Sequence, residues 1–191
     1  RDIAITELRN IDRIAFNPTG SSLAVLRPKK PIAIFSFRER NKKLFELKDK
    51  RKGLKEKPLM LAMCYGSDAR NFIASNSLGE IIVYDTKAYL PQAYIKCSAP
   101  ATALALSSNN YFIASAVGKN IVIWNFQTKE QRTSIPMPAT VKEVAFSTDA
   151  SLLAATTDDN RLTIIDTKNW EKVDIFDKLG GKLTSPSFHP E

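Results

Sequence analysis

The sequence predicts an all-β protein, a β-propeller built from four-stranded antiparallel blades. Three observations predict it. A four-part unit recurs about every forty residues, each part is a short apolar or β-branched run without helical periodicity, and polar turns rich in Gly, Asn and Asp separate the parts. A unit of four short strands cannot bury both of its faces alone, so several such units must pack side by side.

The first part of each unit is a short apolar strand that ends in a turn. Its large apolar residues fall 47, 43, 40 and 42 residues apart, and they are Phe16, Met63, Leu106, Phe146 and Phe188. A bulky apolar side chain at one fixed place in every unit indicates a strand that contributes to the core. We therefore expect inner strands at 14–18, 61–64, 104–107 and 144–147, and the start of a fifth unit at 182–188.

The second and third parts form a hairpin. The second part carries an Ala at the same place each time and is expected at 22–26, 72–75, 112–116 and 152–156. The third part is β-branched and aromatic and is expected at 32–36, 81–85, 121–125 and 162–166. The turns between them contain Gly79, Gly118 and Asn160, residues that tolerate positive φ.

The fourth part is weaker and more polar. We expect it at 42–47, 92–96, 131–135 and 172–176, as the outer strand of each blade. Charged side chains there are typical of an edge that avoids pairing with another chain.

These motifs together resemble the WD40-repeat family. The third strand closes on Tyr84-Asp85, Trp124-Asn125 and Ile165-Asp166, and a Thr-Lys pair follows shortly in each of these units. The blades are divergent, because the sequence contains no Gly-His pair and only Trp124 stands at the Trp position. The resemblance covers nearly the whole chain and implies a WD40-like propeller that presents loops to partner proteins. The divergence implies that packing between blades stabilises it more than the family's Trp hydrogen-bond network.

We expect residues 1–191 to form one partial propeller. The blades are expected at 11–58, 59–98, 99–138 and 139–179, with a basic insert at 38–58. Residues 1–10 are expected to be an outer strand of a preceding blade, and 180–191 an inner strand of a further one. Unpaired sheet edges are poorly tolerated in a monomer, so we expect a larger ring, most often of seven blades in this family.

The residues that usually carry catalysis or hold metals are scarce. The chain has one histidine, and its only cysteines, Cys64 and Cys97, lie 33 residues apart and are expected to be buried thiols. It has no Gly-rich phosphate-binding motif. Carboxylates such as Asp85, Glu143 and Asp166 are better explained by turns. We therefore expect a non-enzymatic protein without catalytic residues, cofactor or metal site.

The net charge of +8 is concentrated in one segment. Residues 38–57 contain ten basic and four acidic residues and so carry +6. Two interpretations stay open for this segment, Arg38–Lys57: a solvated loop, or an electrostatic patch for an acidic protein, RNA or anionic lipid.

Loops at one end of the propeller are the surface on which the resemblance implies partner binding. The candidate residues combine these loops with the basic segment, and they are Arg27, Lys29, Lys30, Lys50, Arg51, Lys52, Lys55, Lys57, Lys119, Asp158, Asp159 and Arg161. The predicted function is a protein–protein interaction scaffold within a larger assembly. The alternative is a polyanion-binding module that uses Arg38–Lys57 to bind RNA or anionic lipid.

The sequence also bears on compartment. No apolar run reaches the length of about 20 residues that a membrane span needs. Unpaired cysteines favour a reducing compartment, so we expect an intracellular protein, cytoplasmic or nuclear. Secretion stays open, because the chain begins with Arg rather than Met.

Overall fold

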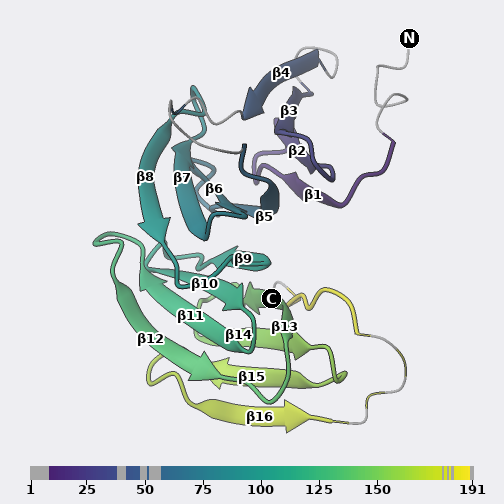
Figure 1. The fold of residues 1–191 in the computed structure, drawn as a ribbon. Coiled ribbons are helices and arrows are strands. Elements are labelled where there is room, and N and C mark those ends of the chain that lie inside the picture. The colour runs from purple at the N-terminus through teal and green to yellow at the C-terminus, as the bar shows by residue number, and fades with distance from the viewer. Residues whose placement is uncertain are drawn as a thin grey trace.

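The chain forms four β-sheets arranged in an arc. A computed structural model describes residues 9–37, 42–47, 51, 57–177, 179, 181 and 183–189. In this part of the chain, sixteen strands form four sheets, and each sheet contains four antiparallel strands in chain order. The first strand of each sheet lies toward the middle of the arc and the fourth lies on its outer rim (Figure 1). The predicted all-β fold of propeller blades is confirmed.

The observed strands match the predicted ones to within three residues. Blade 1 contains β1 (Arg13–Phe16), β2 (Ser22–Leu26), β3 (Ile32–Ser36) and β4 (Lys42–Leu47). Blade 2 contains β5 (Met60–Tyr65), β6 (Asn71–Asn76), β7 (Glu80–Asp85) and β8 (Pro91–Lys96). Blade 3 contains β9 (Ala103–Leu106), β10 (Phe112–Val117), β11 (Asn120–Asn125) and β12 (Gln131–Pro136). Blade 4 contains β13 (Val141–Phe146), β14 (Leu152–Thr157), β15 (Leu162–Asp166) and β16 (Lys172–Phe176).

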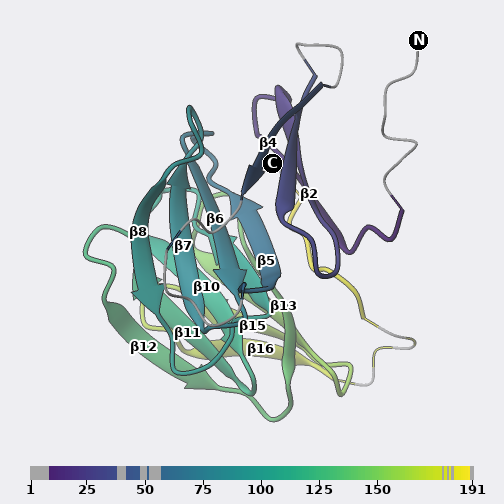
Figure 2. The ribbon, with the colours of Figure 1, turned by 45° about the horizontal axis from the view of Figure 1, so that its top comes forward.

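The core lies between consecutive blades. One apolar cluster joins blades 1 and 2, another joins blades 2 and 3, and a third joins blades 3 and 4. Seen from another angle, the blades stand as twisted sheets packed face to face (Figure 2). The middle strands of blades 1 to 3 are almost entirely buried, as in β10 and β11, because both of their faces are covered by side chains. This explains their continuous apolar runs. In blade 4, β15 is only partly buried.

Every turn class repeats its backbone conformation from blade to blade. The turns after the inner strands place Gly20, Ala69, Asn110 and Ala150 at φ between 56° and 66°. In each of them that residue's N–H donates to the carbonyl three positions earlier, at 2.7–3.0 Å. The turns after the third strands likewise place Tyr89, Lys129 and Trp170 at positive φ. The backbone conformation of these turns therefore recurs from blade to blade, and residues other than Gly also adopt positive φ in them.

The residues that close the third strands cap the turns that follow. Asp85 accepts hydrogen bonds from the backbone N–H groups of Lys87 and Ala88 at 3.0 and 2.9 Å. Asn125 and Asp166 accept equivalent bonds in blades 3 and 4. The backbone bond from Ala88, followed by others from the same turn, holds the pKa of Asp85 below its usual value. The prediction that these carboxylates stabilise turns is confirmed for Asp85 and Asp166. It is wrong for Glu143, which lies within strand β13 and pairs with Arg13.

Trp124 is buried and forms one hydrogen bond that the sequence does not reveal. Its Nε1 donates to Ser115 Oγ at 2.9 Å, and that hydroxyl donates to the carbonyl of Val122 at 3.1 Å. Trp124 pairs with Ile113 in the ladder between β10 and β11, so Ser115 lies two residues along on the same face and within reach. Trp170 is half-buried, and its ring and that of Phe112 form an edge-to-face pair.

Blade 4 leaves apolar side chains uncovered. Its outer strand, β16, was expected to be polar, yet Val173, Ile175 and Phe176 are 57%, 53% and 42% exposed. Phe176 pairs with Leu162, at the place that the buried Ile95 and Ile135 occupy in the two preceding blades. Those two residues are covered by the following blade, whereas none of the described strands follows β16.

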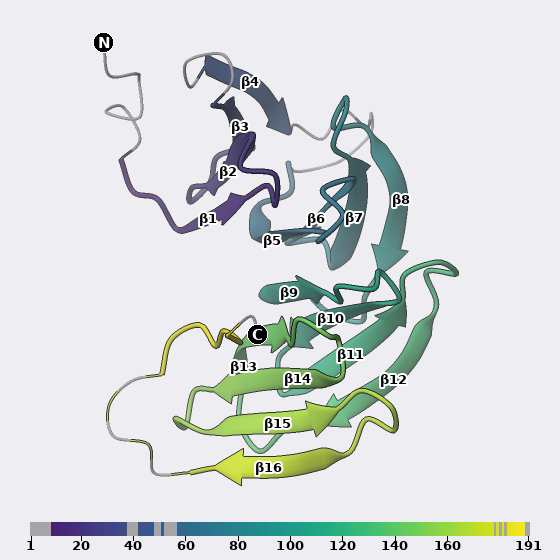
Figure 3. The same ribbon diagram turned by 180° about the vertical axis from the view of Figure 1, so that it is seen from behind.

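The chain termini were expected to contribute strands to neighbouring blades. Residues 1–8 lie outside the described part of the chain, and residues 183–189 form no strand pairs. This last segment runs back beside blade 4 toward β13 (Figure 3). Thr156 Oγ1, in β14, donates to its Thr184 carbonyl at 3.4 Å. The assignment of this segment to a further blade stays a prediction.

The two cysteines are free thiols at the core between blades 2 and 3. Cys97 is part of this apolar cluster, and Cys64 packs against it. Cys97 is buried and Cys64 is half-buried. Burial raises the pKa of Cys64 to about 12 and that of Cys97 to about 11.

In the described part of the chain, no helix has the length and apolar character needed to cross a bilayer.

Candidate partner-binding surface

Two sets of connections meet at one end of the blades. They are the hairpin turns between second and third strands and the connections from each blade to the next. Backbone hydrogen bonds join the two sets: Ser77 N–H donates to Leu59 O at 2.8 Å, and Met137 N–H donates to Lys119 O at 2.8 Å. We call this end, made of residues 27–31, 57–59, 77–79, 97–102, 118–119, 137–140 and 158–161, the hairpin end.

Eight of the twelve candidate partner-binding residues lie at the hairpin end, and they are Arg27, Lys29, Lys30, Lys57, Lys119, Asp158, Asp159 and Arg161. Strand direction explains this placement, because each antiparallel meander returns its second turn to the end where its blade begins. Lys50, Lys52 and Lys55 lie outside the described residues, and Arg51 is held against blade 2.

A cavity opens at the hairpin end between blades 1 and 2. Its volume is about 490 Å³, within the range of about 300–1,000 Å³ that is usual for ligand pockets. Its walls are mostly apolar, from Pro31, Leu47, Pro58, Leu59, Met60, Ile82 and Tyr84. Three candidate residues, Lys29, Lys30 and Lys57, complete its lining. We call this cavity with its three lysines the lysine-rimmed groove.

The rim of the groove is cationic and accessible. Lys29, Lys30 and Lys57 are exposed, and the lining residues that the structure describes include no acidic one. Lys29 sits in the tight turn between β2 and β3 at φ 58°, where the N–H of Lys30 donates to the carbonyl of Arg27 at 3.2 Å. The turn thus fixes the backbone of the two adjacent lysines while their side chains reach solvent.

Arg51 is part of the structure of blade 2. Its guanidinium forms a two-pronged bond with Glu80, with Nη1–Oε1 and Nη2–Oε2 distances of 2.9 and 2.7 Å, and lies 4.5 Å from the ring centre of Tyr94. Glu80 also accepts from Asn76 Nδ2 at 2.8 Å. Bidentate pairing of this kind is geometrically specific. One cation of the basic segment is therefore neutralised by a strand of the next blade.

The candidate residues of blade 4 form hydrogen bonds and an ion pair with residues of their own hairpin and of the connection before β13. Asp158 Oδ1 accepts from the N–H of Thr140 at 3.1 Å. Asp159 accepts from Thr157 Oγ1 at 2.5 Å and pairs with Arg161 Nε at 3.2 Å. These bonds fit the predicted hairpin turn. Lys119, in the β10–β11 turn of blade 3, is exposed.

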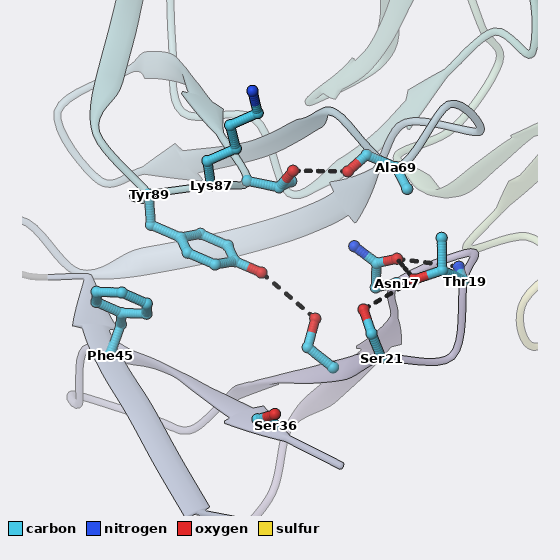
Figure 4. Close-up of a pocket in the computed structure, with 10 residues that line it drawn as sticks. Asn17, Thr19, Ser21, Ser36, Phe45, Ala69, Lys87 and Tyr89 are labelled. Carbon is cyan, nitrogen blue, oxygen red and sulfur yellow. Dashed lines mark hydrogen bonds between the residues drawn. The ribbon is translucent and has the colours of Figure 1, made fainter. Parts of the chain in front are cut away.

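A second, polar pocket lies between blades 1 and 2 near the opposite end (Figure 4). Its volume is about 280 Å³, and hydroxyl groups from Thr19, Ser21, Ser22, Ser36, Thr86 and Tyr89 line it with Asn17 and Lys87. Tyr89 OH lies 3.5 Å from Ser22 Oγ and 2.8 Å from the hydroxyl of Tyr65. Burial raises the pKa of Tyr65 above its usual range.

The sequence does not predict this pocket. Most of its residues belong to turns or to the ends of strands, where Ser, Thr and Asn are common for conformational reasons alone. One sequence signal points to it: Tyr89 places a large aromatic side chain with a hydroxyl group in a turn. The residues at the equivalent positions of blades 3 and 4 are Lys129 and Trp170.

Comparison with known proteins identifies the fold. No family model matches this chain, and no curated protein matches it. The chain is similar to a solved structure described as that of U3-55K, a WD40 propeller protein, with a TM-score of 0.61 and 16% identity over 66% of this chain. The match covers 41% of that structure, so the chain spans about two fifths of its length. Four antiparallel four-stranded sheets and this similarity fit a WD40-like propeller.

Proposed function

We propose that the protein is a non-enzymatic interaction scaffold that binds other proteins through the hairpin end of its propeller. One observation carries the proposal: eight candidate side chains from three blades gather at this end, and three of them surround one apolar cavity. Protein interfaces combine an apolar centre with a polar rim, and the lysine-rimmed groove has this composition. The fold itself does not carry the proposal, because propellers have many functions.

Polyanion binding through Arg38–Lys57 is the alternative, and one contact weakens it. Arg51 lies in the middle of that segment and is already paired with Glu80. Releasing it to a phosphate would require breaking a charge-assisted pair.

We also propose that the four blades belong to a larger propeller. Phe176 supports this, because it occupies the place of Ile95 and Ile135 and is 42% exposed, whereas they are 3% and 6% exposed. A further blade packed on blade 4 would cover it. In the native full-length protein, Phe176→Asp should then destabilise as strongly as Ile135→Asp. A change of less than about 0.5 kcal/mol, typical of surface substitutions, would contradict this.

The scaffold proposal is tested by affinity capture with the native full-length protein, with and without nuclease. Two charge-matched variants are compared: Lys29, Lys30 and Lys119 changed to Gln at the hairpin end, and Arg70, Lys87 and Lys168 changed to Gln at the opposite end. We expect the first variant alone to lose protein partners, with nuclease making no difference. Loss of capture on nuclease treatment would support the polyanion alternative instead.

A further inference from the structure

We propose that the lysine-rimmed groove binds a peptide segment of a partner protein in which one or two large apolar residues are flanked by acidic ones. This rests on the proposed scaffold function and specifies its site and the chemistry of its partner. The apolar residues would enter the cavity between blades 1 and 2, and the acidic residues would lie against Lys29, Lys30 and Lys57.

The floor of the groove suits an apolar side chain. Leu47 and Ile82 are 7% and 2% exposed and belong to the apolar cluster between blades 1 and 2. Leu59, at the mouth, is 43% exposed although it is a large apolar residue. A side chain that enters the groove would therefore contact a preformed apolar surface and cover Leu59, and burial of such surface favours binding at about 25 cal/mol per Å².

The lysines of the rim favour negative charge on the peptide residues that flank the apolar one. Three exposed lysines surround the opening, and none of the described residues that line it carries a carboxylate. They come from two separate connections, residues 29–30 before β3 and residue 57 before β5. A peptide lying across the groove would consequently meet positive charge on both sides of its apolar anchor. Such complementarity fixes orientation and accelerates association.

The walls of the groove favour a peptide over RNA. Proteins that bind single-stranded nucleic acid without sequence preference stack bases on accessible aromatic rings. Among the described residues of the lining, Tyr84 is the only aromatic one, and it is 8% exposed, so its ring face is already covered by protein. The remaining walls are aliphatic side chains and prolines.

The test selects peptides from a random displayed library with the full-length protein. Individual peptides are then measured by fluorescence anisotropy against the wild type and three variants. Lys29→Gln/Lys30→Gln/Lys57→Gln removes the rim charges, and Leu59→Ser removes the apolar residue at the mouth. Arg70→Gln/Lys87→Gln/Lys168→Gln removes equal charge at the opposite end and is the matched control. All the substituted positions are exposed, so thermal melting should show that each variant folds.

We expect selected peptides that contain acidic residues around a large apolar residue. Their dissociation constants should rise about tenfold in the rim variant and severalfold in Leu59→Ser, and stay unchanged in the control. Raising the salt concentration from 0.05 to 0.5 M should weaken wild-type binding about as much as the rim variant does.

The outcomes separate this inference from the scaffold proposal. Peptides that bind the rim and Leu59 variants as well as the wild type would overturn the groove assignment while leaving the scaffold proposal intact. Selection of neutral or basic peptides, or of none, would overturn the stated partner chemistry. Binding of single-stranded RNA or of phosphatidylserine vesicles that the rim variant loses, without any peptide binding, would overturn both.

Discussion

Arg13 and Glu143 join the first blade to the fourth. Arg13 begins β1, Glu143 lies in β13, and Arg13 Nη1 is 2.6 Å from Glu143 Oε1. Arg13 Nη2 also donates to the carbonyl of Thr102 in the connection before β9, at 3.3 Å. Arg13, on the inner side of the arc in blade 1, thus contacts both the connection that leads into blade 3 and a strand of blade 4.

The Arg13–Glu143 pair should contribute modestly to stability. The two side chains are 31% and 21% exposed, so water still screens them. We expect a double-mutant cycle with Arg13→Gln and Glu143→Gln, followed by urea unfolding, to give a coupling of about 0.5–1 kcal/mol. The same cycle for Arg161 and Asp159, a more exposed pair within one hairpin, is the control and should give less. Equal coupling in both cycles would argue against a link between blades.

The hydrogen bond between Trp124 and Ser115 should contribute clearly to the stability of the protein, because both side chains are buried. Trp124 is 6% exposed and Ser115 is fully buried, so Ser115→Ala leaves the indole N–H without its partner, at a cost of about 1–3 kcal/mol. Adding Trp124→Phe to that variant removes the unsatisfied donor, so the double variant should lose less than the sum of the two single ones. Trp170→Phe is the control, since Trp170 packs against Phe112. Strict additivity in denaturant melts would contradict the bond.

The sequence predicted the strands well because each blade repeats one pattern of burial. The spacing from Ile95 to Ile135 to Phe176 follows directly from that repeat. The contacts between distant side chains could not be predicted in the same way. Arg13 and Glu143 lie 130 residues apart, and only the curvature of the arc brings them together.

The sequence does not predict the groove. Lys29, Lys30 and Lys57 were identified as exposed loop charges, but their shared cavity depends on how blades 1 and 2 pack. Arg51 was identified for its charge alone, whereas the structure pairs it with Glu80. A sequence shows which side chains are charged, and packing decides which of those charges remain available to a partner.

Ala69 adopts a backbone conformation that favours glycine. Its φ is 57°, and Gly20 occupies the equivalent place in blade 1. A left-handed conformation strains a residue with a Cβ atom, so Ala69→Gly should stabilise the protein by about 0.5–1 kcal/mol despite the greater freedom of Gly in the unfolded chain. Ala88→Gly, in an exposed turn position without positive φ, is the control and should destabilise. Thermal melts of both variants check this, and a loss of stability in Ala69→Gly would contradict the assigned geometry.

The Arg51–Glu80 pair should make stability depend on pH in acid. The hydrogen bonds from Arg51 are the main cause that holds the pKa of Glu80 below its ordinary value of 4.5, with smaller contributions from Asn76 and Lys96. Because the pKa is lower in the folded than in the unfolded chain, the stabilisation is fully present above about pH 4.5. It is lost as the pH falls through the lower folded pKa.

Urea midpoints measured from pH 7 to pH 3 should therefore show the wild type and Glu80→Gln converging as the pH falls. Other carboxylates with lowered pKa values, such as Asp85 and Asp149, contribute equally to both curves, so the difference between the curves isolates Glu80. Glu130→Gln removes one exposed charge and is the matched control. A constant difference between wild type and Glu80→Gln across this range would show that Arg51 is not bound to Glu80 in solution.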